Sequence, residues 1–222
     1  MIVYGSSLSP FVRKVLVICA EKGLAVDNQV FGPGVPPTPE FTEASPFGKI
    51  PALRDGDYTL ADSSAIAHYL DAKRPEPRLI PDEPQARGKV VWYDELADTI
   101  VFATAVKTFF NRVVGPLIGA PHDVEVAERA ETRELPAILD HLESVAPGEH
   151  GWLVGGAFSL ADISIAAPFV NLALAGRPVC EAAHPRLCAY LRRVHERPSF
   201  QPVIASNRAF IERFRDRLHL AA

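Results

Sequence analysis

Cysteine is scarce in this chain: there are three in 222 residues, Cys19, Cys180 and Cys188. They show no C-x-x-C or His-rich spacing, so neither a metal site nor a dithiol redox motif is indicated. We expect them to be small apolar core residues in a reducing, cytoplasmic compartment rather than a disulfide framework. A chain of this length buries about 70% of its unfolded surface and needs neither crosslinks nor a metal to fold.

Long apolar runs and an excess of positive charge are also missing. No run approaches the roughly 20 residues that cross a bilayer, and the start, Met1 to Tyr4, lacks the basic segment of a secretory signal. The net charge is -4 and the 23 basic residues are scattered, which argues against a nucleic-acid surface. We therefore expect a soluble globular protein with neither a membrane nor a nucleic acid as partner.

The first 76 residues alternate strand and helix signals. A strand over Ile2 to Tyr4 leads through a Gly-Ser-Ser turn into a helix with Ser9 as N-cap, Pro10 at its first position and Gly23 after its end. The elements predicted next are a strand over 26–31, a helical turn over 40–44, a hairpin of strands 51–54 and 58–60 around Asp-Gly, and a helix from Asp62 or Ser63 to Lys73. This order, βαβαββα, predicts an α/β unit with a mixed sheet resembling thioredoxin.

After residue 76 the strand signals end, and a proline-rich stretch is followed by helical patterns. Pro75, Pro77, Pro81 and Pro84 fall within ten residues and predict a linker with little regular structure. The helices predicted after it cover 90–110, 123–145 with a bend at Pro136, 163–174 opened by a Ser159 capping box with Asp162, 185–197 and 207–218. We therefore expect a thioredoxin-like domain over 1–76, a linker over 77–84 and an all-helical domain over 85–222.

Ser9 stands where an anion can be stabilised. A helix N-terminus offers unpaired N–H groups and the positive end of the helix dipole, worth about 0.3–2 kcal/mol to an anion. A thiol has a pKa of about 8.5, so an enzyme that uses one as nucleophile must favour its thiolate. The Ser9 hydroxyl can donate a hydrogen bond to such a sulfur, but a plain N-cap explains the residue at least as well.

Two further segments complete a pattern. In Gly-Lys-Ile-Pro-Ala-Leu over 48–53, Lys49 offers a charge to a carboxylate, and a cis Ile50-Pro51 bond would present kinked backbone to a peptide-like ligand. Asp62 can accept from an ammonium, and Ser63 can donate to a carboxylate. Each also has an ordinary explanation, as a solvated lysine, a trans proline at an edge strand and a helix cap. In order behind Ser9, they predict one site for an anionic, peptide-like thiol.

These motifs resemble a known family. Ser-Pro-Phe after a strand, Gly-Lys-Ile-Pro-Ala-Leu, and Asp-Ser-Ser-Ala-Ile-Ala-His-Tyr-Leu over 62–70 resemble the N-terminal domain of the cytosolic glutathione transferases. Phe-Ser-Leu-Ala-Asp-Ile over 158–163 is similar to the helix-start motif of the family's C-terminal domain. The resemblance implies an enzyme that takes glutathione as co-substrate, uses no metal, and works as a cytoplasmic homodimer.

The resemblance also implies which hydroxyl meets the glutathione sulfur. Ser9 takes this role, with Ser7 and Ser6 as alternatives because family members place the hydroxyl at slightly different points of the turn. The Ser-Pro-Phe context is similar to tau-type and omega-type enzymes and favours Ser9. No cysteine stands at position 9 or 12, so thiol–disulfide exchange by the protein's own sulfur is disfavoured.

The remaining roles that the resemblance implies concern the peptide part of glutathione. Lys49 meets the glycyl carboxylate, and Ile50 binds the cysteinyl backbone with its main chain, presented by a cis Pro51. Asp62 and Ser63 bind the γ-glutamyl end, although many members carry glutamate where Asp62 stands.

An electrophile needs an apolar pocket beside the sulfur. Leu8 and Phe11 border the turn, and Phe210 could close the pocket from near the C-terminus. One face of the predicted helix 90–110 offers Phe102, Val106, Phe109 and Phe110. Packing between the domains is an alternative explanation for these side chains.

We therefore hypothesise a transferase whose bound thiolate attacks a hydrophobic electrophile. Two alternatives remain open: a glutathione-dependent isomerase or dehalogenase, and a non-catalytic interaction scaffold of the same fold.

Overall fold

The N-terminal part of the computed structural model is the predicted thioredoxin-like unit, and the model describes residues 1–31, 36–147, 150–214 and 218. Its mixed sheet has the order β2-β1-β3-β4. β1 (Ile2–Tyr4) pairs in parallel with β2 (Asp27–Gln29) and antiparallel with β3 (Ala52–Asp55), and β3 pairs antiparallel with β4 (Tyr58–Ala61). The βαβαββα prediction is confirmed, although β2 is shorter than the predicted strand.

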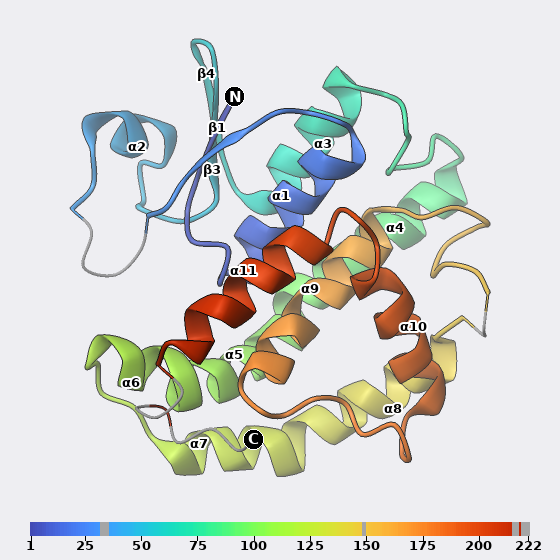
Figure 1. The fold of residues 1–222 in the computed structure, drawn as a ribbon. Coiled ribbons are helices and arrows are strands. Elements are labelled where there is room, and N and C mark those ends of the chain that lie inside the picture. The colour runs from blue at the N-terminus through green and yellow to red at the C-terminus, as the bar shows by residue number, and fades with distance from the viewer. Residues whose placement is uncertain (32–35, 148–149, 215–217, 219–222) are drawn as a thin grey trace.

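Alternation along the strands assigns the two faces of the sheet. Val3 and Leu53 point to the face covered by α1 (Pro10–Glu21) and α3 (Ser63–Lys73), and join their buried side chains in one core. Tyr4 and Ala52 point to the other face and pack against α2 (Pro39–Ala44). Figure 1 shows α2 on one side of the strands and α1 with α3 on the other.

The all-helical part begins with one long, interrupted helix. It comprises α4 (Pro84–Leu96), α5 (Phe102–Phe109) and α6 (Gly115–Ile118), joined by π-helical turns over Ala97–Val101 and Phe110–Val114. The next helix has the same plan, with α7 (Val124–Arg129) and α8 (Leu135–Val145) joined by a π-helical turn over Ala130–Glu134. Pro136, which lacks the N–H of a regular turn, lies directly after this irregularity, at the position of the predicted bend.

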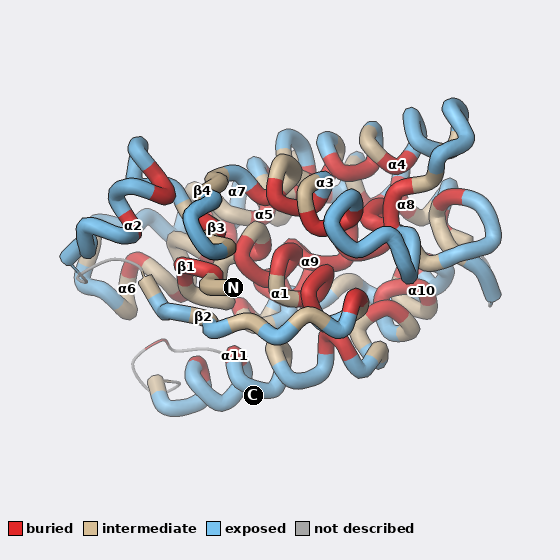
Figure 2. The backbone as a smooth tube through the Cα atoms, turned by 90° about the horizontal axis from the view of Figure 1, so that it is seen from above, coloured by how far each residue is buried: buried red, intermediate tan, exposed pale blue. Residues whose placement is uncertain are grey.

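The centre of the molecule is α9 (Leu160–Leu174), which is buried along most of its length (Figure 2). It packs against α1, α4 and α5, so it joins the two parts of the chain. The predicted capping box is present: the Asp162 carboxylate accepts from the Ser159 backbone N–H at 3.0 Å and from the Tyr190 hydroxyl at 2.9 Å. Because α9 carries apolar side chains around its whole circumference, burial on all sides stabilises it.

Two helices complete the fold, α10 (Pro185–His195) and α11 (Gln201–Glu212). α11 begins six residues before the predicted start at Asn207, because Pro202 is accommodated in the first turn of the helix. Part of the predicted extension to Leu218, residues 215–217, lies outside the described residues.

Within the described residues, one helix could span a membrane by length and composition alone, namely Pro84–Ile118, with a mean hydropathy of 1.2 over its most apolar window. The same helix packs against α9 and carries Asp94 and Asp98, which are ion-paired to Lys14 of α1. These contacts are those of the core helix of a helical domain.

Candidate active site

The turn between β1 and α1 is held close to the Ile50-Pro51 bond. Gly5 has φ +136°, and a Cβ there would lie 2.6 Å from the Val12 side chain and 3.0 Å from Cβ of Ile50. Only glycine fits this close approach. Gly5 thereby brings the hydroxyl-rich turn over 6–9 next to the Gly-Lys-Ile-Pro segment.

The three serines of this turn have different partners. The Ser7 hydroxyl donates to Oδ1 of Asn207 on α11 at 2.7 Å, and the Ser7 carbonyl accepts from the same amide at 2.9 Å. Ser6 Oγ accepts weakly from the Leu8 N–H at 3.3 Å. Ser9 caps α1, but its Oγ is 3.5 Å from the Val12 nitrogen, so the hydroxyl is only loosely engaged.

The second motif, over 48–53, and the third, over 62–70, meet at the open end of the β3–β4 hairpin, where Ala52 pairs with Ala61. The Ile50-Pro51 bond is cis. Asp62 has φ +81° and is the one non-glycine residue with positive φ in the part of the chain that the structure describes. Its Oδ1 accepts from the backbone N–H groups of Ser64 and Ala65 at 2.9 and 3.0 Å, which decides between Asp62 and Ser63 as the cap of α3. A costly backbone conformation retained at a cavity wall is typical of a functional position.

A cavity of about 640 Å³ brings the second and third motifs together, and we call it the polar cavity because it carries the charged side chains of the site. Lys49, Ile50 and Pro51 line one side, and Asp62 and Ser63 line the other. The remaining lining residues are Phe11, Ser45, Pro46, Phe47, Ala61, Ser64, Glu95, Asp98 and Thr99. Its volume is in the range of small-molecule sites, and its charged groups are of both signs, as a zwitterionic peptide requires.

An apolar cavity of about 340 Å³ adjoins it. Ser6 and Ser9 line it, whereas Ser7 does not, and Ile50 lines both cavities and marks their junction. The other lining residues are Leu8, Pro10, Val30, Phe102, Ala105, Val106, Phe109, Val114, Leu117, Ile118, Pro168, Asn171 and Phe210. A reactive atom held near Ile50 would therefore sit between a peptide-sized polar site and an apolar one.

Two residues expected in the apolar pocket lie elsewhere. Phe11 lines the polar cavity, and its ring packs against that of Phe102 with centroids 4.4 Å apart, so it supports the pocket wall from behind. Phe110 does not line the cavity. At about 3.6 residues per turn, Phe110 falls beyond Val106, outside the arc of α5 that lines the cavity.

Comparison with known proteins agrees with this geometry. Residues 3–78 match the family model for the glutathione S-transferase N-terminal domain, and residues 97–198 match that for the C-terminal domain. The chain is 34% identical to glutathione S-transferase 3 of Zea mays over 91% of its own length and 92% of the relative's.

The chain belongs to the glutathione S-transferase family.

Two further similarities extend the comparison. A theta-class glutathione S-transferase from Xanthomonas axonopodis, solved with glutathione bound, superposes with a TM-score of 0.77 at 26% identity, over 91% of this chain and 96% of that one. A stringent starvation protein A homolog of Pasteurella multocida is 28% identical over 90% of this chain and 88% of its own. The fold is thus shared by proteins with different names.

This family member carries a buried charge cluster behind its polar cavity. Lys14 Nζ of α1 lies 2.8 Å from Oδ1 of Asp94 and 2.7 Å from Oδ2 of Asp98. Ser164 of α9 donates to Asp94 at 2.5 Å. Burial raises the pKa of Asp98, and the Lys14 charge only partly offsets this. Because Asp98 also lines the polar cavity, the cluster connects that cavity to the domain interface.

The sequence reasoning missed several residues that hold the candidate site in place. Arg13, Asn171 and Asn207 all bind the turn that carries Ser9, through hydrogen bonds to Ser7 or Leu8. The spacing of Arg13 four residues after Ser9, on one helix face, is the one signal that could have found any of them. Asn171 and Asn207 reach the turn from α9 and α11, and no local pattern predicts that.

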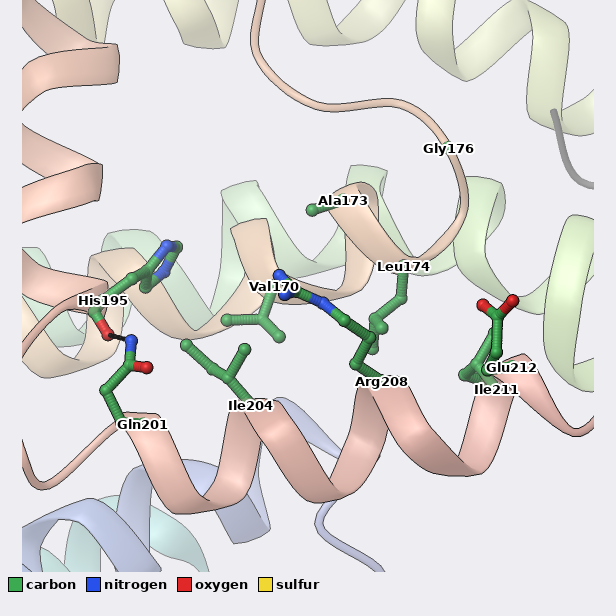
Figure 3. Close-up of a pocket in the computed structure, with 10 residues that line it drawn as sticks. All are labelled: Val170, Ala173, Leu174, Gly176, His195, Gln201, Ile204, Arg208, Ile211 and Glu212. Carbon is green, nitrogen blue, oxygen red and sulfur yellow. Dashed lines mark hydrogen bonds between the residues drawn. The ribbon is translucent and has the colours of Figure 1, made fainter. Parts of the chain in front are cut away.

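A third cavity, of about 300 Å³, lies between α9, α11 and the end of α10 (Figure 3). Arg208 and Glu212 extend from α11 toward α9, and Gln201 donates to the His195 carbonyl at 2.6 Å. None of the predicted site residues of the transferase lines it. Within the described ranges, no three His, Cys, Asp or Glu side chains converge as a metal-binding group.

Proposed function

We propose that this transferase binds glutathione across the polar cavity, holds its thiol as thiolate at Ser9, and transfers it to a hydrophobic electrophile in the apolar cavity. The observation that carries the proposal is the junction of the two cavities at Ile50, with Ser9 lining the apolar side. An extended tripeptide lying in the polar cavity would place its central residue at this junction.

The polar side chains suit the three parts of glutathione. Lys49 is exposed at the cavity rim and pairs with the glycyl carboxylate. The main chain of Ile50, beside cis Pro51, pairs with the cysteinyl backbone. Asp62 accepts from the γ-glutamyl ammonium, and Ser63 donates to its carboxylate. Glu95 and Asp98 add negative charge at that end.

Ser9 is the hydroxyl that meets the sulfur in this proposal. Ser7 is engaged with Asn207, and the choice lies between the two serines that line the apolar cavity. Ser9 is favoured over Ser6 because it stands at the N-terminus of α1, where helix N–H groups and the dipole also favour an anion. When the thiol binds, its proton leaves to solvent, and the hydroxyl donates to the thiolate.

The reaction is then nucleophilic attack by the thiolate. A carbon–sulfur bond forms at the electrophilic carbon, and either a leaving group departs with its electron pair or a double bond accepts the electrons and is protonated. The apolar lining excludes water and holds the electrophile against the sulfur, so proximity supplies much of the rate.

The family resemblance also supports a homodimer in the cytoplasm. Phe47 is 90% exposed at the rim of the polar cavity, and an aromatic ring so placed suits burial against a second copy. All three cysteines are free thiols, in keeping with a reducing compartment. Only Cys19 is the core residue that was predicted, since Cys180 is exposed and Cys188 is half-buried. Sedimentation velocity of the wild type and of Phe47→Ser tests the dimer, and a wild-type monomer at micromolar concentration would contradict it.

Glutathione binding followed by conjugation assays tests the function. We expect retention on immobilised glutathione, release by free glutathione, and turnover of apolar aryl halides or unsaturated carbonyl compounds. Binding without turnover of any electrophile would favour the interaction scaffold. Turnover limited to double-bond isomerisation or to haloalkanes would favour the isomerase or dehalogenase. Failure to bind glutathione would overturn the proposal.

A further inference from the structure

Three buried cations lie in helix α1 or directly after it, and they differ in whether a carboxylate pairs with them. Lys14 is paired with Asp94 and Asp98, and Lys22, just after the helix, is paired with Asp71 at 2.7 Å. Arg13 is 0% exposed, yet no carboxylate among the described residues lies within ion-pairing distance of it. A buried charge without a counterion is strongly destabilising, so its presence calls for an explanation.

The hydrogen bonds of Arg13 lead to the turn that carries Ser9. One guanidinium nitrogen donates to the Ala167 carbonyl at 2.6 Å and to Oδ1 of Asn171 at 2.7 Å, and the other donates to the Ser7 carbonyl at 3.1 Å. Asn171 in turn donates to the Leu8 carbonyl at 2.8 Å and lines the apolar cavity. Since Arg13 follows Ser9 by four residues and helical side chains lean toward the N-terminus, the guanidinium lies beneath the Ser9 turn.

The surroundings of Arg13 leave its charge uncompensated. Nε of Arg13 is buried and has no hydrogen-bond partner. Burial lowers the pKa of Arg13 to about 9, so the group is still protonated at neutral pH. From α10 it is faced by His195, whose pKa is lowered to about 4 by burial, while a hydrogen bond to the Ala166 carbonyl opposes that shift. His195 is therefore neutral, and it lines the third cavity (Figure 3).

The apolar cavity offers no compensating charge either. Its described lining consists of apolar side chains, two serines and Asn171. The carboxylates of the buried cluster, Asp94 and Asp98, are engaged by Lys14 and by the hydroxyls of Ser164 and Ser64, and neither pairs with Arg13. Arg13 is thus the buried positive group next to the Ser9 turn. Because it is buried, water screens its charge poorly.

We propose that Arg13 is a positioning residue that holds the Ser9 turn and supplies the buried positive charge favouring the thiolate of bound glutathione. The inference rests on the proposed function. The thiol proton goes to solvent and Arg13 keeps its own protons, so the site changes from an unpaired buried cation to a cation with a nearby anion. Arg13 does not touch the reacting atoms. It acts through the electrostatic field of its guanidinium and through the hydrogen bonds that hold the Ser9 turn.

The variants Arg13→Lys and Arg13→Gln separate the effect of the positive charge from the effect of the guanidinium's hydrogen-bonding geometry. Lysine keeps the charge but loses the planar fork, and glutamine keeps a polar group but loses the charge. The thiol pKa of bound glutathione, measured from thiolate ultraviolet absorbance against pH, should stay near the wild-type value in Arg13→Lys. In Arg13→Gln it should rise by about one unit, with turnover at neutral pH about tenfold lower. Equal pKa values in all three proteins, or an equal rise in both variants, would overturn the inference.

A second pair of variants serves if Arg13→Gln does not fold. Asn171→Ala and Asn171→Asp both lose the donation to Leu8, but only aspartate adds a carboxylate within reach of Arg13. The bound thiol pKa should be higher in Asn171→Asp than in Asn171→Ala, and equal values would overturn the inference. If the wild type binds glutathione without thiolate absorbance, the proposed function fails instead. The two failures are therefore distinguishable.

Discussion

The two cavities that meet at Ile50 are built in opposite ways. The polar cavity takes most of its lining from two short segments, 45–51 and 61–64. They lie before and after the β3–β4 hairpin in the sequence and meet at its open end. The apolar cavity collects side chains from segments that are spread along the chain between Ser6 and Phe210. Local motifs thus define the polar half of the site, which is the polar cavity. Packing between distant segments defines the apolar half, which is the apolar cavity.

This difference matches what each half is proposed to recognise. A co-substrate that never varies can be bound by a few charges and backbone groups held at fixed spacing. An electrophile that varies is bound by apolar area, which depends on the shape that several helices make together. Substitutions at Ser9, Asp62, Val106 and Lys49 test whether the two halves can be altered separately.

Removal of the Ser9 hydroxyl should have the largest effect, because Ser9 is the residue proposed to hold the thiolate where the two cavities adjoin. In Ser9→Ala we expect turnover about 10- to 100-fold lower, since a hydrogen bond to an anion is lost, with a higher pKa of the bound thiol. The KM for glutathione should change little, because the polar cavity is intact. Ser6→Ala is the matched control and should behave as wild type in pH–rate profiles. The reverse pattern would move the catalytic role to Ser6.

The polar half of the site was largely predictable from the sequence. Ser9 as cap, the cis bond before Pro51 and the convergence of Lys49 with Asp62 all follow from patterns within a few residues. Capping, turn chemistry and motif spacing are local, so a single sequence contains them. The thioredoxin-like order of elements was predictable for the same reason.

The apolar half was predictable only in part. Phe102, Val106 and Phe109 were found by helical spacing, but the same spacing also selected Phe110, which lies just outside the lining arc of α5. Val30 and Asn171 come from elements whose packing against the turn has no local signal. Arg13 was missed because its burial depends on α9, which lies about 150 residues further along the chain.

Asp62 should show that the polar half can be damaged without harm to the fold. Asp62→Gly suits the φ of +81° and is a tolerable N-cap, whereas Asp62→Ala loses the cap and strains the backbone. Both should raise the KM for glutathione about 10-fold by loss of a charge-assisted hydrogen bond. Only Asp62→Ala should also lower Tm, by about 2–4 °C. Thermal denaturation with glutathione titration checks this, and an unchanged KM in Asp62→Gly would remove Asp62 from the site.

Val106 should show that the apolar half can be altered without harm to glutathione binding. It is partly exposed on α5 and lines the apolar cavity, so Val106→Trp fills space meant for the electrophile. We expect the KM for bulky electrophiles to rise about 3- to 10-fold, with little change in glutathione affinity. Ala103→Trp places the same ring on the exposed face of α5 and serves as control. If both variants behave alike, or if glutathione affinity falls with Val106→Trp, the two halves are not separable at this position.

Lys49 should give the smallest effect, and it tests one end of the polar half alone. The side chain is exposed, so the proposed pairing with a glycyl carboxylate would be screened by water and salt. Lys49→Gln should raise the KM for glutathione about 2- to 5-fold at low ionic strength, and the difference should shrink as salt is added. γ-Glutamylcysteine lacks the glycine, so its KM should be the same in both proteins. An equal loss for the dipeptide would mean that Lys49 acts on the cavity as a whole rather than on the glycyl end. The division of the polar half into separate contacts for each part of the peptide would then need revision.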